Sequence, residues 1–469
     1  MTRKSLLFIF MVFLLSVSAI AGEISLEEAV RTGLENNHEL VQKYQDLLNL
    51  ERERASLEAG IGWTWSVGSN YGYVSERYTG NIYNPVAESM DSLAFTLDGG
   101  KITLKGLDIN THFSLTDYEP FSFENLDENY RFRLDVSKRL FPLLPTGAER
   151  SLLQLDGRIR LAEDDLAQAR IRKEIEWVSA YLNLLRLQER IQDAQARYRL
   201  ALENLASVEF QAKMGEAGKE QLLAAQLAVK EAELQEKQLL NTFLQARDSF
   251  ILDTGIDGEL LLTKDSDYLR GFLERADAID IELGTEEIER LLRDNNLQLR
   301  QLKFSREYAE EELKWQEDEG KIKVDTFGNY NYDAGLPEEY RSYWELGVGV
   351  SYEFYDSGEQ KLAVEGIEAR IENLEREYAH TLERLKQELA AMYAQYRVDQ
   401  MALEIRALGL ERTRLQAALY REQYENGLLS DNHYEEIVLA LRQAEQDYKE
   451  ALDKVRFDKL KIALFLGIY

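Results

Sequence analysis

The chain has 469 residues, a formal net charge of -29 at pH 7 and an isoelectric point of about 4.7. This acidic balance argues against nucleic-acid binding, because the phosphates would repel the chain. The absence of cysteine excludes disulfides and thiolate metal sites, while the length is enough for two or three domains.

Residues 1–21 are expected to form a secretory signal peptide. Arg3 and Lys4 form its basic end, residues 6–17 are apolar, and Ala19-Ile20-Ala21 is a small-x-small cleavage site. The alternative is an N-terminal membrane anchor, which the short apolar stretch and the cleavage site disfavour. No cysteine follows, so lipid attachment at the new N-terminus is excluded. After residue 21 there is no run of about 18 apolar residues, so any passage through a membrane is expected to use strands.

The remaining chain is predicted to contain an internal repeat, with two copies of one structural unit over residues 22–255 and 285–469. The repeat is carried by matching Glu-Glu and Asn-Asn pairs: Glu27-Glu28, Asn36-Asn37, Glu286-Glu287 and Asn295-Asn296. Each copy reads as helix, strand, strand, long helix, tight break and return helix. Residues 252–284 form an acidic, glycine-punctuated linker in which we expect short helices.

The first copy is predicted to begin with a helix over residues 26–59. Strands at 62–75 and 129–141 follow, because apolar and polar residues alternate there with a period of two. The insertion between them, residues 76–128, is expected to be an extracellular loop, and the alternative is that it adds strands to the barrel. It carries a hairpin signal with a turn at Asp98-Gly99-Gly100.

The second copy is predicted to contain a helix at 285–318 and strands at 321–333 and 343–355. The last strand alternates most cleanly, with apolar residues and terminal aromatic residues on one side, which suits a lipid-facing strand. The alternative is an ordinary sheet that is buried on one side. The residues predicted to face lipid are Trp63, Trp65, Trp344, Leu346, Val348, Val350, Tyr352 and Phe354.

Long helices are predicted at 148–214 and 359–426, with return helices at 218–250 and 432–466. Their apolar residues recur at alternating spacings of three and four, as in coiled coils. The fold class is therefore mainly α, with long coiled-coil-like helices and four membrane strands in each chain. Four such strands cannot close a barrel, and open strand edges are not tolerated in lipid, so several chains must share one barrel.

In this order of elements the chain resembles the TolC-like outer membrane efflux proteins. The resemblance is carried by the doubled Glu-x7-Asn-Asn pattern that starts at Glu28 and Glu287. Two further segments are similar, Tyr352-Glu353-Phe354-Tyr355-Asp356-Ser357-Gly358 and Tyr424-Glu425-Asn426-Gly427-Leu428-Leu429-Ser430-Asp431. The resemblance implies a homotrimer in which four strands from each chain form a shared 12-stranded β-barrel, continued by a long periplasmic α-barrel.

The resemblance further implies an outer-membrane exit duct of a tripartite efflux or type I secretion system. Such a duct is passive and docks to a periplasmic adaptor (membrane fusion protein) and an inner-membrane pump. The helix tips expected to dock the adaptor are Met214, Gly215, Glu216, Asn426, Gly427 and Leu428. A plain helix C-cap is the alternative explanation of each glycine, because glycine adopts the left-handed conformation that ends a helix. Glu216 departs from the apolar residue usual at that position, which leaves the adaptor contact open there.

The resemblance also points to a periplasmic gate just after the second tip glycine, with Asp431, His433, Glu435 and Glu436 as candidates. A trimer would triplicate each acid and so favour cations in the constriction. The alternative is a solvated helix start, where acidic residues are favourable.

No catalytic, cofactor-binding or metal-binding residues are predicted. The four histidines are scattered without metal-ligand spacing, and no nucleophile and base stand in a catalytic pattern. An alternative of another class is a periplasmic coiled-coil tether without a pore, although a tether has no need of four aromatic-rich strands with polar opposite faces. Drug, metal ion and protein stay open as the transported substrate.

Overall fold

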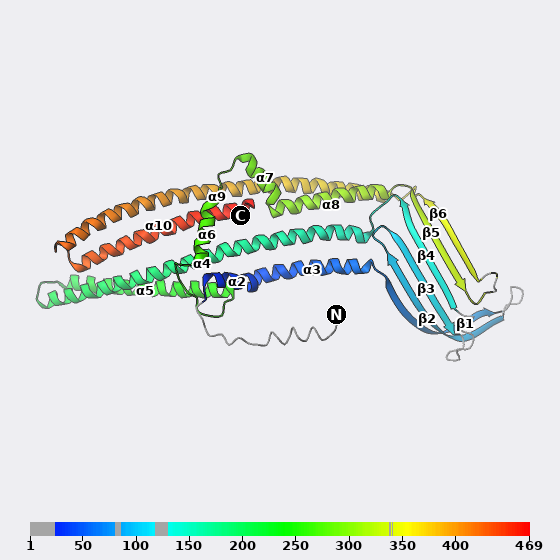
Figure 1. Ribbon diagram of the computed structural model, residues 1–469, viewed down its shortest axis with the longest axis horizontal. Coiled ribbons are helices and arrows are strands. Elements are labelled where there is room, and N and C mark those ends of the chain that lie inside the picture. Colours follow the sequence, from blue (N-terminus) through cyan, green and yellow to red (C-terminus); the bar gives the residue numbers. More distant parts are fainter. Residues whose placement is uncertain (1–23, 80–85, 118–129, 337–338, 340) are drawn as a thin grey trace. The chain divides into compact units, whose positions relative to one another are not determined.

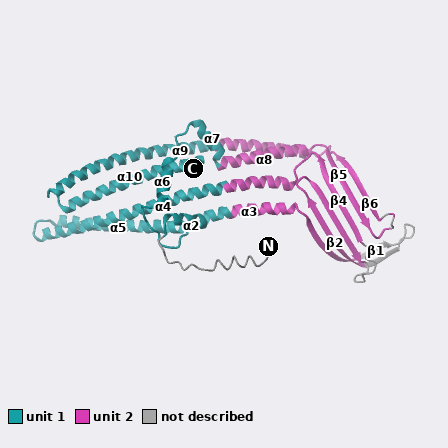
Figure 2. Ribbon diagram, viewed as in Figure 1, with its two compact units in different colours: residues 1–44, 164–296, 382–469 teal, residues 45–163, 297–381 magenta. Residues whose placement is uncertain are grey.

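The computed structural model describes residues 24–79, 86–117, 130–336, 339 and 341–469 (Figure 1). The expected signal peptide lies outside this part of the chain. The chain divides into two compact units (Figure 2): unit 1 comprises residues 1–44, 164–296 and 382–469, and unit 2 comprises residues 45–163 and 297–381. Each unit contains segments from both halves of the sequence. The boundaries of the two repeats remain a prediction.

Unit 1 is helical. It contains α2 (Leu26–Asn36), α5 (Lys219–Thr254), α6 (Asp267–Ala278), α7 (Thr285–Asn295) and α10 (Asp431–Leu466), with parts of α3 (His38–Gly60), α4 (Gly147–Lys213) and α9 (Glu359–Glu425). Among the described residues, none of the helices combines the length and the apolar character needed to span a bilayer.

The opening helix of each repeat is broken, so the single helices predicted at 26–59 and 285–318 are wrong. The backbone N–H of Asn37 donates to Gly33 O (2.9 Å), and the Asn37 Oδ1 accepts from the backbone N–H groups of Glu39 (3.1 Å) and Leu40 (3.3 Å). Asn37 therefore ends α2 and caps α3. Asn296 holds the same place between α7 and α8 (Leu297–Glu319).

The main core of unit 1 gathers around the middle of α4, where Trp177, Val178, Tyr181 and Leu184 are fully buried. Trp177 packs against Gly33 of α2, where a Cβ atom would lie 2.7 Å from the indole ring. The hydroxyl of Tyr181 lies 2.9 Å from Leu261 O and accepts from the backbone N–H of Thr263 (2.9 Å). These contacts fix the segment after α5 against the long helix.

The described residues of unit 2 contain one antiparallel sheet with six strands in the order β1-β2-β3-β4-β5-β6 (Figure 1). The strands are β1 (Thr64–Thr79), β2 (Val86–Ile102), β3 (Leu107–Asp117), β4 (Tyr130–Phe141), β5 (Lys323–Asp333) and β6 (Ser342–Ser351). The four predicted strands correspond to β1, β4, β5 and β6. The predicted number of four per chain is wrong, because the insertion adds β2 and β3 to the same sheet.

The hairpin turn of the insertion also lies elsewhere than predicted. Asp98-Gly99-Gly100 is part of β2, and the chain reverses at residues 103–106, where Gly106 has a φ of +70° and donates to Thr103 O (2.9 Å). Gly99 serves a different purpose, since a Cβ atom there would overlap the Trp65 ring of β1 and crowd Thr111 of β3. Close packing between strands, not a turn, explains this glycine.

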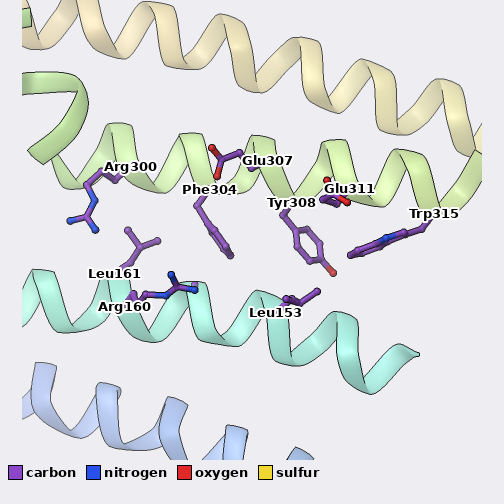
Figure 3. A pocket seen from close by; sticks show the side chains of 10 residues that line it. Leu153, Arg160, Leu161, Arg300, Phe304, Glu307, Tyr308, Glu311 and Trp315 are labelled. Atoms are coloured by element: carbon purple, nitrogen blue, oxygen red, sulfur yellow. The ribbon is translucent and has the colours of Figure 1, made fainter. Parts of the chain in front are cut away.

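Within unit 2, α4 and α8 enclose a pocket of about 540 Å³ (Figure 3). Gly157 of α4 faces Phe304 of α8, and a Cβ atom at Gly157 would overlap the phenyl ring. At the other end, the Arg150 guanidinium lies 5.1 Å from the Trp315 ring centroid and pairs with Glu319 (3.2 Å). The pocket is therefore bounded by contacts that join the two helices.

Candidate functional site

The register of the sheet divides its side chains into a mainly apolar face and a mainly polar face. Residues directly opposite one another in an antiparallel ladder share a face, and successive residues alternate. The apolar face carries Trp65, Val67, Tyr71 and Tyr73 of β1, Phe95 and Leu97 of β2, Phe113 and Leu115 of β3, Phe132, Leu134 and Val136 of β4, Tyr330 of β5, and Trp344, Leu346, Val348 and Val350 of β6. The polar face carries Ser66 and Asn70, Thr96 and Asp98, His112 and Ser114, Arg133 and Asp135, Asn329 and Asn331, and Glu345.

The apolar face of β6 is left uncovered by the chain itself. The exposed fractions are 71% for Trp344, 75% for Leu346, 64% for Val348 and 68% for Val350. In water such a continuous apolar surface is unfavourable, so it is suited to lipid or to a partner. The alternative of a sheet buried on one side by its own chain does not match these exposed fractions.

Aromatic and cationic side chains gather where β1 begins. Trp63 stacks on Trp65 with ring centroids 5.7 Å apart, and Lys101 Nζ lies 5.8 Å from the Trp63 ring centroid. Aromatic rings and long cationic side chains of this kind are typical of a membrane–water interface.

Three of the predicted lipid-facing residues, Trp63, Tyr352 and Phe354, lie outside the strands to which they were assigned, because β1 begins at Thr64 and β6 ends at Ser351. The last ladder pair of β6 joins Ser351 to Lys323, the first residue of β5. Tyr352 and Phe354 follow this pair, so no β5 residue remains to pair with them, although both are exposed. Asp356 then accepts from the backbone N–H of Gly358 (2.9 Å) and starts the turn into α9.

The two predicted helix tips have the same backbone geometry. Gly215 (φ +85°) follows α4, and Gly427 (φ +71°) follows α9. At the first tip Glu216 N–H donates to Gln211 O (2.9 Å), and at the second Leu428 N–H donates to Gln423 O (2.9 Å). This six-to-one bond with a left-handed glycine is the Schellman arrangement that ends a helix.

All six predicted tip residues are exposed, with Met214 at 62% and Leu428 at 77%. No heavy atom lies within 4 Å of a Cβ atom built at either tip glycine. Backbone conformation alone therefore accounts for these glycines within the chain, and the space around them is open to another molecule.

The second tip is fastened by aromatic residues that the sequence analysis did not identify. Tyr424 of α9 and Tyr434 of α10 stack with ring centroids 4.3 Å apart, and Tyr420 meets His433 edge-on at 5.9 Å. A hydrogen bond to the Asp431 carboxylate raises the pKa of the Tyr424 hydroxyl above its ordinary value. The spacing of Tyr420 and Tyr424, one helical turn apart and followed by Tyr434 after the break, is the signal that could have revealed this contact.

The four gate candidates lie together in the first turns of α10. Asp431, His433, Glu435 and Glu436 are exposed, and His433 Nδ1 lies 3.4 Å from Glu436 Oε2. The structure thus brings three carboxyl groups and an imidazole to one helix start beside the tip. Their role as a gate remains a prediction.

Comparisons with known proteins agree with this architecture. Residues 290–467 match the family model described as Outer membrane efflux protein. No curated protein sequence matches the chain.

Solved structures share the fold at low sequence identity. The transmembrane channel CusC has a TM-score of 0.62 at 11% identity, covering 94% of this chain and 91% of CusC. The CmeC outer membrane channel of Campylobacter jejuni has a TM-score of 0.61 at 12% identity, with 94% and 85% covered. The outer membrane protein VceC of Vibrio cholerae has a TM-score of 0.59 at 12% identity, with 94% and 96% covered. The resemblance to the TolC-like proteins is thereby confirmed: residues 290–467 match the outer membrane efflux protein family, and the chain has the fold of its outer-membrane channels.

Proposed function

We propose that this protein is the outer-membrane exit duct of a tripartite efflux or type I secretion system. The observation that carries the proposal is the sheet of unit 2, with one uncovered apolar face and one polar face. Such a sheet suits a barrel wall that has lipid outside and water inside. The duct is passive, and the energy for transport comes from an inner-membrane pump.

The two edges of the sheet support assembly into a homotrimer. Among the described residues, β1 and β6 each pair on one side only. Unpaired backbone groups are costly in hydrocarbon, so β6 of one copy needs β1 of the next. The trimer itself is taken from the resemblance to the TolC-like proteins.

The helix tips are the proposed docking points for a periplasmic adaptor. Gly215 and Gly427 lie at matching breaks, have open space around them and are flanked by the exposed apolar side chains of Met214 and Leu428. Glycine permits close approach of another backbone, and the neighbouring apolar groups gain by being covered.

Purification in detergent followed by reconstitution in planar bilayers tests the proposed function. We expect oligomers of three chains that resist heating and that conduct ions in single-channel recordings. The competing periplasmic tether would give neither membrane insertion nor conductance. Conductance would support this channel in particular, because the sheet already has the apolar face and the polar face that a barrel wall requires.

The gate proposal makes a separate prediction for Glu436. Glu436→Ala removes one carboxylate per chain from the narrow end of the duct, so the permeability ratio of cations to anions is expected to fall by about twofold or more. Reversal potentials measured across a potassium chloride gradient report this ratio. Unchanged selectivity would count against Glu436 as a gate residue.

Glu220→Ala is the matched control for this measurement. Glu220 is an exposed acid in the first turn of α5, at the other helix tip, so its removal changes the net charge equally. We expect it to leave selectivity nearly unchanged. A similar loss in both variants would assign the effect to overall charge instead of the α10 site.

A further inference from the structure

The inserted hairpin of β2 and β3 extends along the sheet from end to end. Thr64, the first residue of β1 after α3, pairs with Gly100 near the end of β2. Leu107, the first residue of β3, pairs with Lys138 near the end of β4, just before α4. The turn at residues 103–106 therefore lies at the helix-bearing end of the sheet, where an extracellular loop would not reach.

The two faces of the sheet continue through the middle of the hairpin. Phe95 pairs with Leu115, and Leu97 with Phe113, on the apolar face between Val67 of β1 and Phe132 of β4. Thr96 pairs with Ser114, and Asp98 with His112, on the polar face. A shift of the pairing register by one residue would move the apolar side chains of the hairpin to the polar face. The observed register therefore gives the hairpin the same apolar and polar surroundings as the neighbouring strands.

We infer that the hairpin is part of the lipid-embedded wall, so that the assembled channel is an 18-stranded barrel instead of a 12-stranded one. This inference rests on the proposed function, which supplies the trimer. The part of the chain that the structure describes contributes six strands, and three chains give 3 × 6 = 18. The occupant of each free sheet edge is a second copy of this chain, with β6 of one copy beside β1 of the next.

The inference keeps three copies in the assembly and adds strands to each copy. The chain and the solved channels CusC and VceC cover each other almost completely, with 94% of this chain matched in both cases. The chain thus shares the overall fold of these channels, and the inference keeps the three copies that the resemblance to the TolC-like proteins implies. Two copies would also give 12 strands, so the number of chains in the assembly is a direct test.

A wider pore through the membrane follows from the larger strand number. Barrel diameter grows roughly in proportion to the number of strands, so 18 strands give an interior about 1.5 times as wide as 12. The hairpin also brings its own polar groups to the interior, including the Asp98 and His112 pair. The enlarged section suits bulky or strongly hydrated cargo at the membrane exit.

Cysteine labelling in lipid vesicles tests whether the hairpin is wall. The chain has no cysteine of its own, so single substitutions give one reactive site each. Thr96→Cys and Ser114→Cys are expected to face the aqueous interior, and Phe95→Cys and Phe113→Cys to face lipid. A membrane-impermeant maleimide should label the first pair about tenfold faster or more, because a thiol in hydrocarbon does not form the reactive thiolate.

Two strands outside the hairpin supply the controls. Asn329→Cys on β5 and Val348→Cys on β6 should differ in the same sense. If these two differ but the hairpin positions react alike, the hairpin is not wall and the 18-stranded barrel is wrong, while the channel function stands. If the controls also react alike, the proposed function itself fails.

Native mass spectrometry of the same unsubstituted protein in detergent counts the chains. Three chains together with alternating hairpin reactivity support the 18-stranded barrel. Two chains would overturn it in favour of a 12-stranded barrel made by a dimer.

Discussion

Replacing Val348 by arginine is expected to prevent the sheet from entering the membrane. Val348 lies near the middle of β6, pairs with Thr326 of β5 and belongs to the apolar face. An arginine on the lipid face near the bilayer midplane costs about 2–4 kcal/mol in each chain. The expected result is loss of heat-resistant oligomers and of conductance, with the protein recovered outside the membrane fraction.

Gly349→Arg is the matched control for this substitution. Gly349 is the next residue along β6 and faces the other side of the sheet, where the nearest atom to a built Cβ is Asp325 O at 4.0 Å. The same arginine then has room and faces the aqueous interior, so the expected change in stability is within about 0.5 kcal/mol. Equal effects of the two arginines would mean that both faces meet the same surroundings, which contradicts a membrane wall.

The parts of the fold that the sequence predicted well are those whose signal is local. Strict alternation of apolar and polar residues located β6, and the left-handed glycines Gly215 and Gly427 located the ends of α4 and α9 to within one residue. In each case the determining residues lie next to one another in the chain. A pattern in one segment then suffices to place the element.

Two errors in the element assignment involve residues that also contact distant parts of the chain. Gly99 lacks a side chain because Trp65 of another strand occupies the space, so a glycine pair that resembles a turn lies within β2. Asn37 breaks the opening helix, and its side-chain amide donates to Asp253 O (2.8 Å) of α5, 216 residues away. Neither partner is visible from the sequence around the residue.

The candidate sites divide in the same way. The tip residues and the acids of α10 were predicted from the family resemblance, and the structure leaves all of them exposed, while their roles remain predictions. The stacked pair of Tyr424 and Tyr434 was missed because it joins two helices across a turn, although the spacing of these tyrosines carries a signal for it. The sequence also left the number of strands in the sheet open, since it depends on where the insertion finds its pairing partners.

Replacing Trp177 by alanine is expected to destabilise the helical unit by about 3–5 kcal/mol, the range for truncating a fully buried tryptophan. The Trp177 side chain is 1% exposed and packs against Gly33. Its truncation therefore leaves a cavity in the core. Its Nε1 donates to Asp253 Oδ2 (2.6 Å), whose other oxygen accepts from Asn37 Nδ2 (3.0 Å). Through Asp253, Trp177 thus links α4 to α5 and to Asn37, the residue between α2 and α3. Chemical unfolding followed by circular dichroism of the helices measures the free energy of unfolding.

Two further variants separate packing from hydrogen bonding. Trp177→Phe keeps much of the apolar volume and loses the bond to the Asp253 carboxylate, so a smaller cost of about 1–3 kcal/mol is expected. Phe210→Ala truncates an aromatic residue of the same helix that is 61% exposed, and there we expect a change within about 0.5 kcal/mol. If Trp177→Ala were as mild as Phe210→Ala, the middle of α4 would not be the core of unit 1. Since the same core holds the segment after α5 in place through Tyr181, its loss should also loosen the attachment of residues 261–263 to the long helix.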